Sequence, residues 1–216
     1  MNLFKKEQED VKVIRPPNSG WLEKKLSKKE MDYLWRCIEN KRGSNKERLA
    51  GNIHASNILN DRSDWFFINT LRPLIKNYEE EFPYTGCDIP TTLRHPYHLQ
   101  TWWVNYQKQH EFNPEHDHAG VYSFVVWMKI PTKYDEQIKN PLASNSTIKA
   151  ISTFQFQYAT IFGKIASYVY PMNPENEGTL VFFPAALRHQ VYPFFNCEED
   201  RISISGNICL NTAKTL

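Results

Sequence analysis

Apolar positions in the first part of the chain follow a helical spacing. They recur at intervals of three and four residues, at Met31, Leu34, Trp35 and Ile38. The preceding Ser27-Lys28-Lys29-Glu30 has the form of a capping box, and Gly43 is typical of a residue at which a helix ends. This pattern predicts one amphipathic helix between the two signals.

A second helical pattern begins near Asp61. Its apolar face comprises Trp65, Ile68, Leu71, Ile75, Tyr78 and Phe82. Pro73 falls inside this pattern and lacks the N–H group that a helix interior needs. We therefore expect the helix to kink or to split in two at this proline.

The pattern changes to short strands after residue 98. Apolar, β-branched and aromatic runs cover residues 99–107, 121–130, 151–158, 164–170, 178–183 and 201–210. Turn signals at Asn113-Pro114, Asn173-Pro174 and Pro184 separate them, and residues 132–150 resemble a surface insertion. Six to eight strands after a helical half predict a mainly β fold with flanking helices (α+β). We expect a sandwich or jelly roll with the helices packed outside.

Length and composition fit one folded domain. The chain has 216 residues, of which 41% are hydrophobic, 23% charged and 14% aromatic. The aromatic content favours a packed, sheet-rich interior and excludes a disordered chain. We expect residues 1–216 to form a single domain, with a mainly helical part over residues 1–90 and a jelly-roll core over residues 98–210.

Charge and cysteine content limit further the class of protein that the sequence can encode. The formal net charge is only +2, so no basic field points to nucleic acid. No apolar stretch approaches a bilayer span, and Met1 to Asp10 has no apolar signal-peptide core. Cys37, Cys87, Cys197 and Cys209 form no CxxC pair, which predicts reduced thiols in a cytoplasmic protein.

The placement of three histidines suggests a metal site. His116 and His118 flank Asp117 just before the strand from residue 121, and alternate residues of a strand point to the same side. His189 follows a strand and a proline turn. Imidazole suits iron and other first-row metals. An HxH pair alone also occurs without a metal. His54, His95, His98 and His110 lack such an arrangement.

The last strand carries a polar face. By alternation, one side presents Arg201, Ser203, Ser205 and Asn207, and the other presents Ile202, Ile204 and Ile208. An arginine that points into a small barrel needs a carboxylate, which it can bind bidentately, and a nearby hydroxyl can add a third hydrogen bond. The alternative is that this polar face is exposed to solvent.

Together these residues resemble the Fe(II)/2-oxoglutarate-dependent oxygenase superfamily, and most closely its prolyl-hydroxylase-like members from phage and bacterial genomes. Four stretches carry the resemblance: Trp103 to Tyr106, His116 to His118 with the strand to Trp127, Gly178 to His189, and Arg201 to Ser203. It covers about residues 98–210, roughly half of the chain. It implies a double-stranded β-helix, a cupin-like jelly roll, with iron at the mouth of the barrel.

The resemblance also implies residue roles. His116 and His189 would be metal ligands, and Arg201 with Ser203 would bind the far carboxylate of 2-oxoglutarate. Asn105 or Tyr106 would line the co-substrate pocket, and their opposite parity lets only one of them face inward. No further catalytic residue is implied beyond the metal centre.

One position departs from the common pattern of the superfamily. Most members use His-x-Asp, whereas position 118 is His and the carboxylate is at Asp117. Either His118 completes a three-histidine triad, which strand geometry favours, or a bent backbone lets Asp117 bind. The departure also leaves open a halogenase-like site, another kind of metal site, or a degenerate one.

The implied activity is a dioxygenase that uses Fe(II), 2-oxoglutarate and O₂ to hydroxylate a small molecule or a protein side chain, with succinate as co-product. The sequence does not specify the substrate, and the near-neutral charge argues against nucleic acid. Two alternatives remain. One is a cupin-like metal enzyme that does not use 2-oxoglutarate, and the other is a non-enzymatic jelly-roll module for binding or structure.

Overall fold

The computed structural model describes residues 12–13, 16, 18–83, 89 and 91–216. Met1 to Asp10 and Cys87, which entered the sequence argument, lie outside the described residues. The main helices are α1 (Lys28–Glu39) and α2 (Arg72–Glu81), and two short helices, α3 (Tyr134–Gln137) and α4 (Pro141–Ser144), lie within the 132–150 insertion. No helix among the described residues is long and apolar enough to cross a membrane.

Helix α1 begins with the predicted capping box. The Ser27 hydroxyl accepts a hydrogen bond from the backbone N–H of Glu30, and the Glu30 carboxylate accepts one from the backbone N–H of Ser27. The helix ends at Glu39, earlier than the prediction at Gly43. The Asn40 side chain donates to the carbonyl of Arg36 at 2.7 Å and satisfies a carbonyl of the last turn.

The second helical segment is irregular, as Pro73 predicted. Asp61 caps it by accepting hydrogen bonds from the N–H groups of Phe66 and Phe67, and a π-helical turn (Phe67–Leu71) precedes α2. Pro73 is the second residue of α2, which directly follows the π turn in a continuous helical backbone. The π turn shifts the helical register, so Phe66 is buried and Ile68 is 39% exposed. The prediction of Ile68 on the buried face was wrong for this reason.

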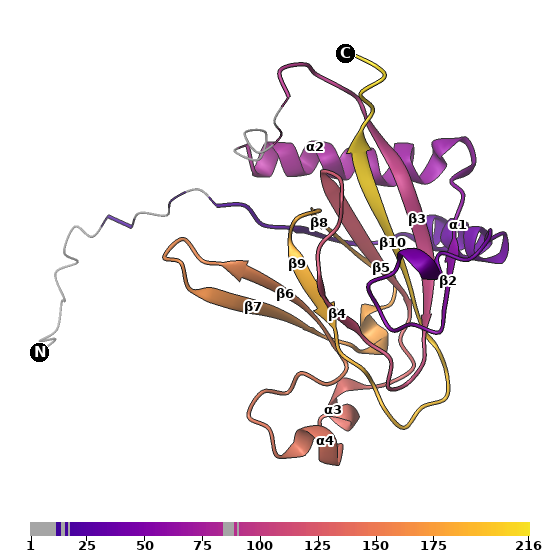
Figure 1. Ribbon diagram of the computed structural model, residues 1–216, viewed down its shortest axis with the longest axis vertical. Helices are drawn as coiled ribbons and strands as arrows, with labels where there is room; N and C mark the ends of the chain where they lie inside the picture. Colours follow the sequence, from indigo (N-terminus) through magenta and orange to yellow (C-terminus); the bar gives the residue numbers. More distant parts are fainter. Residues whose placement is uncertain (1–11, 14–15, 17, 84–88, 90) are drawn as a thin grey trace, which may run out of the picture.

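In the described part of the chain, ten strands form two antiparallel sheets (Figure 1). The large sheet has the order β1–β8–β5–β10–β3–β2, and its strands are β1 (Leu22–Lys25), β8 (Thr179–Pro184), β5 (Tyr122–Lys129), β10 (Arg201–Leu210), β3 (Tyr97–Gln107) and β2 (Ala55–Ile58). The small sheet has the order β4–β9–β6–β7, and its strands are β4 (Asn113–His116), β9 (Arg188–Val191), β6 (Thr153–Ala159) and β7 (Ile165–Pro171).

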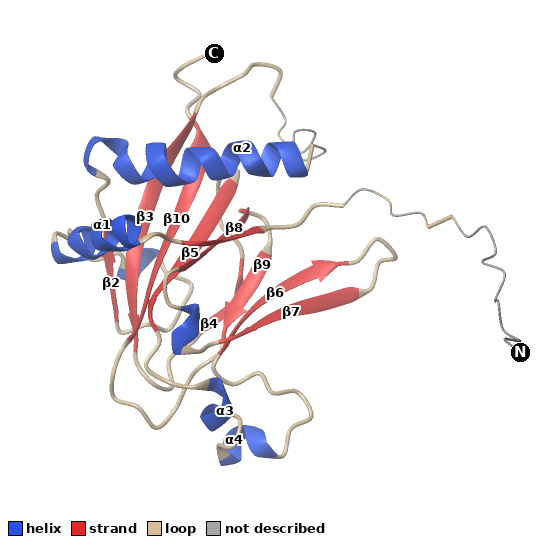
Figure 2. Ribbon diagram, turned by 180° about the vertical axis from the view of Figure 1, so that it is seen from behind, coloured by secondary structure: helices blue, strands red, loops and turns tan. Residues whose placement is uncertain are grey.

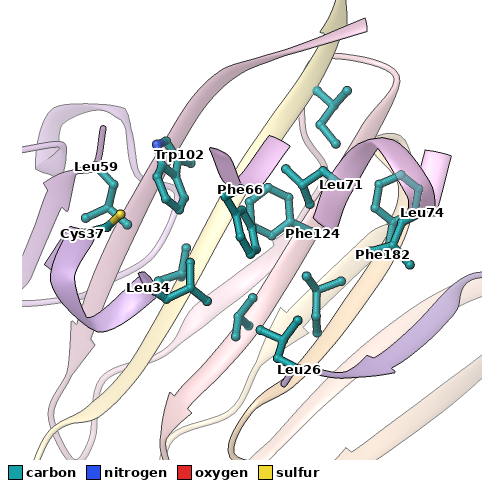
Figure 3. Close-up of a cluster of buried hydrophobic side chains, with 14 of the residues drawn as sticks. Leu26, Leu34, Cys37, Leu59, Phe66, Leu71, Leu74, Trp102, Phe124 and Phe182 are labelled. Atoms are coloured by element: carbon teal, nitrogen blue, oxygen red, sulfur yellow. The ribbon is translucent and has the colours of Figure 1, made fainter. Parts of the chain in front are cut away.

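Two hydrophobic clusters define the layers. One lies between the large sheet and helices α1 and α2, which cover its outer face (Figure 2), and it includes Leu34, Phe66, Trp102 and Phe124 (Figure 3). The other lies between the two sheets and contains Trp127 of the large sheet and Phe156 of the small sheet. The fold is therefore a jelly roll with helices packed outside, as predicted.

The six predicted strands are all present within a few residues of their expected ends. The pattern did not reveal β1, β2, β4 and β9, which have four residues each. Residues 132–150 do form a surface insertion, in which Leu142 and Ile148 are exposed. Cys37, Cys197 and Cys209 are free thiols.

Candidate metal centre

Three histidine side chains converge at one end of the small sheet. His116 is the last residue of β4, His118 lies in the following loop, and His189 is on β9, where the strand register places it opposite His116. One nitrogen from each ring lies within 4.8 Å of the others. These are the three histidines that the sequence pattern predicted as candidate metal ligands.

Backbone carbonyls orient two of the three rings. His116 Nδ1 lies 2.8 Å from the carbonyl of Pro114, and His189 Nδ1 lies 2.9 Å from that of Leu187. A carbonyl can only accept, so each Nδ1 carries the proton and each Nε2 keeps a lone pair for a metal. His118 Nε2 lies 3.2 Å from His189 Nε2, a contact that needs a proton or a cation between the two nitrogens.

Burial keeps two of the imidazoles neutral. Burial first, and then the neighbouring imidazoles, lower the pKa of His189 to about 3 and that of His118 to about 4. His189 also packs under aromatic rings, with Phe154 stacked at 5.5 Å and Phe183 at 5.1 Å between centroids. Neutral imidazole is the form that binds a metal ion, so these side chains are ready to bind at neutral pH.

Asp117 lines the same cavity but is not part of the histidine cluster. Its carboxylate lies 3.3 Å from the guanidinium of Arg188, which also pairs with Glu115, and both partners of this ion pair are about half exposed. The expected grouping of His116 with His118, without Asp117, therefore occurs, but not through strand alternation. Strand β4 ends at His116, and the backbone N–H of His118 donates to the carbonyl of Ala185 at 2.9 Å instead.

Arg201 is buried in the same cavity without a counter-charge. It is 3% exposed, and in the described part of the chain no carboxylate forms an ion pair with it. Its guanidinium donates to the Ser152 hydroxyl at 2.7 Å and, more weakly, to the carbonyl of Tyr192 and the amide oxygen of Gln107. Phe194 lies 4.7 Å away across its face, while Nε has no partner. Burial lowers the pKa of this arginine.

The rest of β10 confirms the predicted alternation. Arg201, Ser203, Ser205 and Asn207 all line the cavity that holds the histidines, which has a volume of about 270 Å³. Ile202, Ile204 and Ile208 pack on the opposite face, in the cluster beneath the helices. The alternative of a solvent-exposed polar face is thereby excluded.

The parity of β3 settles which of its two candidate residues faces the cavity. Asn105 lines the cavity, is 6% exposed, and has no partner for its side-chain oxygen. Tyr106 packs in the cluster beneath the helices, with the ammonium of Lys41 5.5 Å from its ring. The expectation of Tyr106 as a pocket residue is therefore wrong, because adjacent residues of a strand face opposite sides.

Sequence reasoning missed several cavity residues. Trp103 and Gln107 share the inward face of β3 with Asn105, so the same alternation could have found them. Ser152 gave no signal, because it precedes β6 in a backbone conformation with φ of 50°. Among the other histidines, His54 lies beside Glu111 and Asp200, away from the metal cluster.

Comparison with known families decides the class. Residues 101–207 match a family described as "Putative 2OG-Fe(II) oxygenase". The chain belongs to the 2OG-Fe(II) oxygenases. Iron(II) and 2-oxoglutarate are accordingly the metal and the co-substrate of this oxygenase, and the cavity fits both. Three imidazoles offer the metal neutral ligands, and the unpaired Arg201 offers a cation to a dicarboxylate.

Solved structures of low sequence identity are similar to the oxygenase. HygX from Streptomyces hygroscopicus, solved with nickel, 2-oxoglutarate and hygromycin B bound, is 9% identical with a TM-score of 0.52, over 90% of this chain and 84% of HygX. A Pseudomonas putida prolyl-4-hydroxylase is 13% identical with a TM-score of 0.48, over 89% and 94% of the two chains. A collagen prolyl hydroxylase of Paramecium Bursaria Chlorella virus-1 is 12% identical with a TM-score of 0.47, over 87% and 94%. No curated protein sequence matches the chain.

Proposed function

We propose that residues 1–216 form a single Fe(II)/2-oxoglutarate-dependent dioxygenase domain that hydroxylates a C–H bond of a small molecule or a protein side chain. In this proposal His116, His118 and His189 bind the metal, and Asp117 does not. Arg201 binds the far carboxylate of 2-oxoglutarate, with Ser203 and Asn105 lining the same pocket. Bound iron supplies the activation of O₂ that is coupled to decarboxylation of the co-substrate.

The observation that carries the proposal is the burial of Arg201 without a partner charge. A buried, uncompensated guanidinium destabilises a fold by several kcal/mol. Here it shares one cavity with three imidazoles that can hold a cation. A molecule with a carboxylate at one end and metal-binding oxygens at the other satisfies both features, and 2-oxoglutarate has this chemistry.

The other cavity residues orient and shield the bound groups. Ser152 and the carbonyl of Tyr192 hold the guanidinium in place, so a carboxylate meets a fixed donor pair. The aromatic wall around His189, which includes Phe154, excludes water from that side of the site.

The test is an anaerobic titration of metal-free protein with Fe(II) and then with 2-oxoglutarate. We expect a weak visible charge-transfer band that appears only when both are present and is absent in Arg201→Met. Arg188→Met, at an exposed arginine near the same histidines, is the matched control and should retain the band. Succinate release in air, with a candidate substrate added, then tests hydroxylation.

The outcomes separate the proposal from its alternatives. Metal binding without a band at saturating 2-oxoglutarate would indicate a cupin-like metal enzyme that does not use this co-substrate. Absence of stoichiometric metal binding would contradict both enzymatic functions and favour a jelly-roll binding module.

A further inference from the structure

The indole N–H of Trp103 is a buried donor without an acceptor. Trp103 is 9% exposed, its side chain lines the metal cavity, and its Nε1 has no hydrogen-bond partner among the described residues. Leaving a buried N–H unsatisfied is unfavourable, and such groups are rare in folded proteins. The group therefore points to a ligand that supplies an acceptor.

The position of Trp103 assigns it to the metal end of the cavity. Its ring lies 5.8 Å from that of His118, between centroids. In the β3–β10 register Trp103 pairs with Ser205, whereas Gln107 pairs with Arg201. Four residues of strand, roughly 13 Å, thus separate Trp103 from the position opposite the arginine. Each end of the cavity holds an unpartnered donor, Trp103 Nε1 at one and Arg201 Nε at the other.

The charges of the cavity indicate what the acceptor is. Arg201 is the only lysine or arginine among the residues described as lining the cavity. An anionic group at the histidine end would therefore meet the metal, neutral donors and Asp117, whose own carboxylate is paired with Arg188. A carboxylate is the stronger acceptor for an N–H group, since a hydrogen bond to a charged partner is worth about twice a neutral one.

We propose that Trp103 is a positioning residue whose Nε1–H donates a hydrogen bond to the carboxylate beside the keto group of 2-oxoglutarate. This inference rests on the proposed function, because it requires the far carboxylate to bind Arg201 and the 2-oxo acid end to lie at the histidines. The hydrogen bond fixes the rotation of that carboxylate about the metal. Trp103 would thereby hold the co-substrate in one orientation at the metal site.

The test compares two ligands on Zn(II)-loaded protein by calorimetric titration. One is 2-oxoglutarate, and the other is 4-oxopentanoate, which has a methyl group in place of the carboxylate beside the keto group. Trp103→Phe removes the N–H and keeps an aromatic ring. Trp102→Phe is the matched control, because Trp102 stacks on Phe66 beneath the helices, on the opposite face of the same strand.

We expect Trp103→Phe to weaken 2-oxoglutarate binding about 10-fold or more and 4-oxopentanoate binding less than 2-fold. Trp102→Phe should change neither affinity by more than 2-fold, and Arg201→Met should weaken both ligands. An equal loss for both ligands in Trp103→Phe, or no loss for 2-oxoglutarate, would overturn the inference. Failure of the proposed function looks different, because wild-type protein would then bind neither ligand and Arg201→Met would change nothing.

A second measurement does not depend on the variant folding. The six tryptophans provide six indole N–H signals in an NMR spectrum of the ¹⁵N-labelled Zn(II) protein. Saturating 2-oxoglutarate should move one indole signal downfield, and saturating 4-oxopentanoate should leave it nearly in place. If no indole signal distinguishes the two ligands, Trp103 does not donate to the carboxylate.

Discussion

Replacing Arg201 by methionine should make the ligand-free protein more stable while removing its response to 2-oxoglutarate. Methionine has a similar length and carries no charge. Burial lowers the pKa of Arg201 from 12.5 to about 9, which corresponds to about 5 kcal/mol of destabilisation of the charged form. Against this, the variant loses hydrogen bonds to Ser152, Tyr192 and Gln107 and the contact with Phe194, together about 2–4 kcal/mol.

The difference predicts a ligand-free variant that is about 1–3 kcal/mol more stable than wild type. For a chain of this length, 2 kcal/mol raises the melting temperature by about 4–8 °C. Wild-type protein should gain about 2.7 kcal/mol from 2-oxoglutarate at 100 times its dissociation constant, and the variant should gain nothing. The difference in free energy of unfolding between the variant and wild type should therefore become smaller or change sign when 2-oxoglutarate is added.

The assay is thermal or urea unfolding of the Zn(II) protein with and without 2-oxoglutarate. Arg188→Met is the control, because an exposed ion pair contributes little to stability. A ligand-free Arg201→Met that is destabilised by more than about 2 kcal/mol would refute the reasoning. Arg201 would then act mainly as a structural link between the sheets.

Three further predictions concern the ligand set, pH and packing. His118→Ala should weaken Zn(II) binding by more than 100-fold and Asp117→Ala by less than 3-fold, as measured by competition with a chelating dye; the opposite order would make Asp117 the ligand. Burial raises the pKa of Glu30, but the hydrogen bonds that its carboxylate accepts outweigh it and lower the pKa to about 2. The stabilising effect of the ionised carboxylate is thus complete above pH 4.5 and disappears as the pH falls toward 2. Glu30→Gln should therefore lower the free energy of unfolding in urea by about 1–2 kcal/mol at pH 7, and by progressively less below pH 4.5. A difference that stays constant with pH would contradict this. Gly206→Ala should destabilise by about 1–3 kcal/mol in the same assay, because the added methyl group would lie 2.7 Å from the Phe124 ring; an unchanged midpoint would show that the ring moves freely.

Sequence patterns predicted those elements of the fold that interactions between residues close in the sequence determine. The capping box placed the start of α1, and alternation in β10 separated the cavity-lining residues from the core. The four-residue strands β1, β2, β4 and β9 are too short for a period to be recognised, and pairing with distant strands defines them. Pro73 was correctly expected to disturb the helix. The π turn that precedes it shifts the register of the buried positions, and this shift could not be predicted from residue spacing alone.

The site residues that could be predicted are those whose side chains bind metals or carry a charge. Three histidines and one arginine stood out because burying such groups requires a partner. Ser152 could not be found, since a serine in a turn has no distinctive pattern and its role depends on a hydrogen bond from Arg201, which is distant in the sequence. Trp103 was overlooked for a different reason. A buried tryptophan is ordinary in a β-rich protein, and only the missing partner of its nitrogen sets it apart.

The contact between Arg201 and the carbonyl of Tyr192 has a consequence for co-substrate choice. Tyr192 follows His189 by three residues, so one short stretch of backbone, roughly 10 Å long, ties the guanidinium to a proposed metal ligand. Arg201 itself belongs to β10 of the large sheet, so this hydrogen bond joins the two sheets beside the proposed metal ligand and helps to set the distance between cation and metal. In the proposed binding mode, this contact would limit the length of co-substrate that reaches both the guanidinium and the metal. We therefore expect a five-carbon 2-oxo dicarboxylate to bind more tightly than homologues one carbon shorter or longer, even though all of them carry the same charged ends.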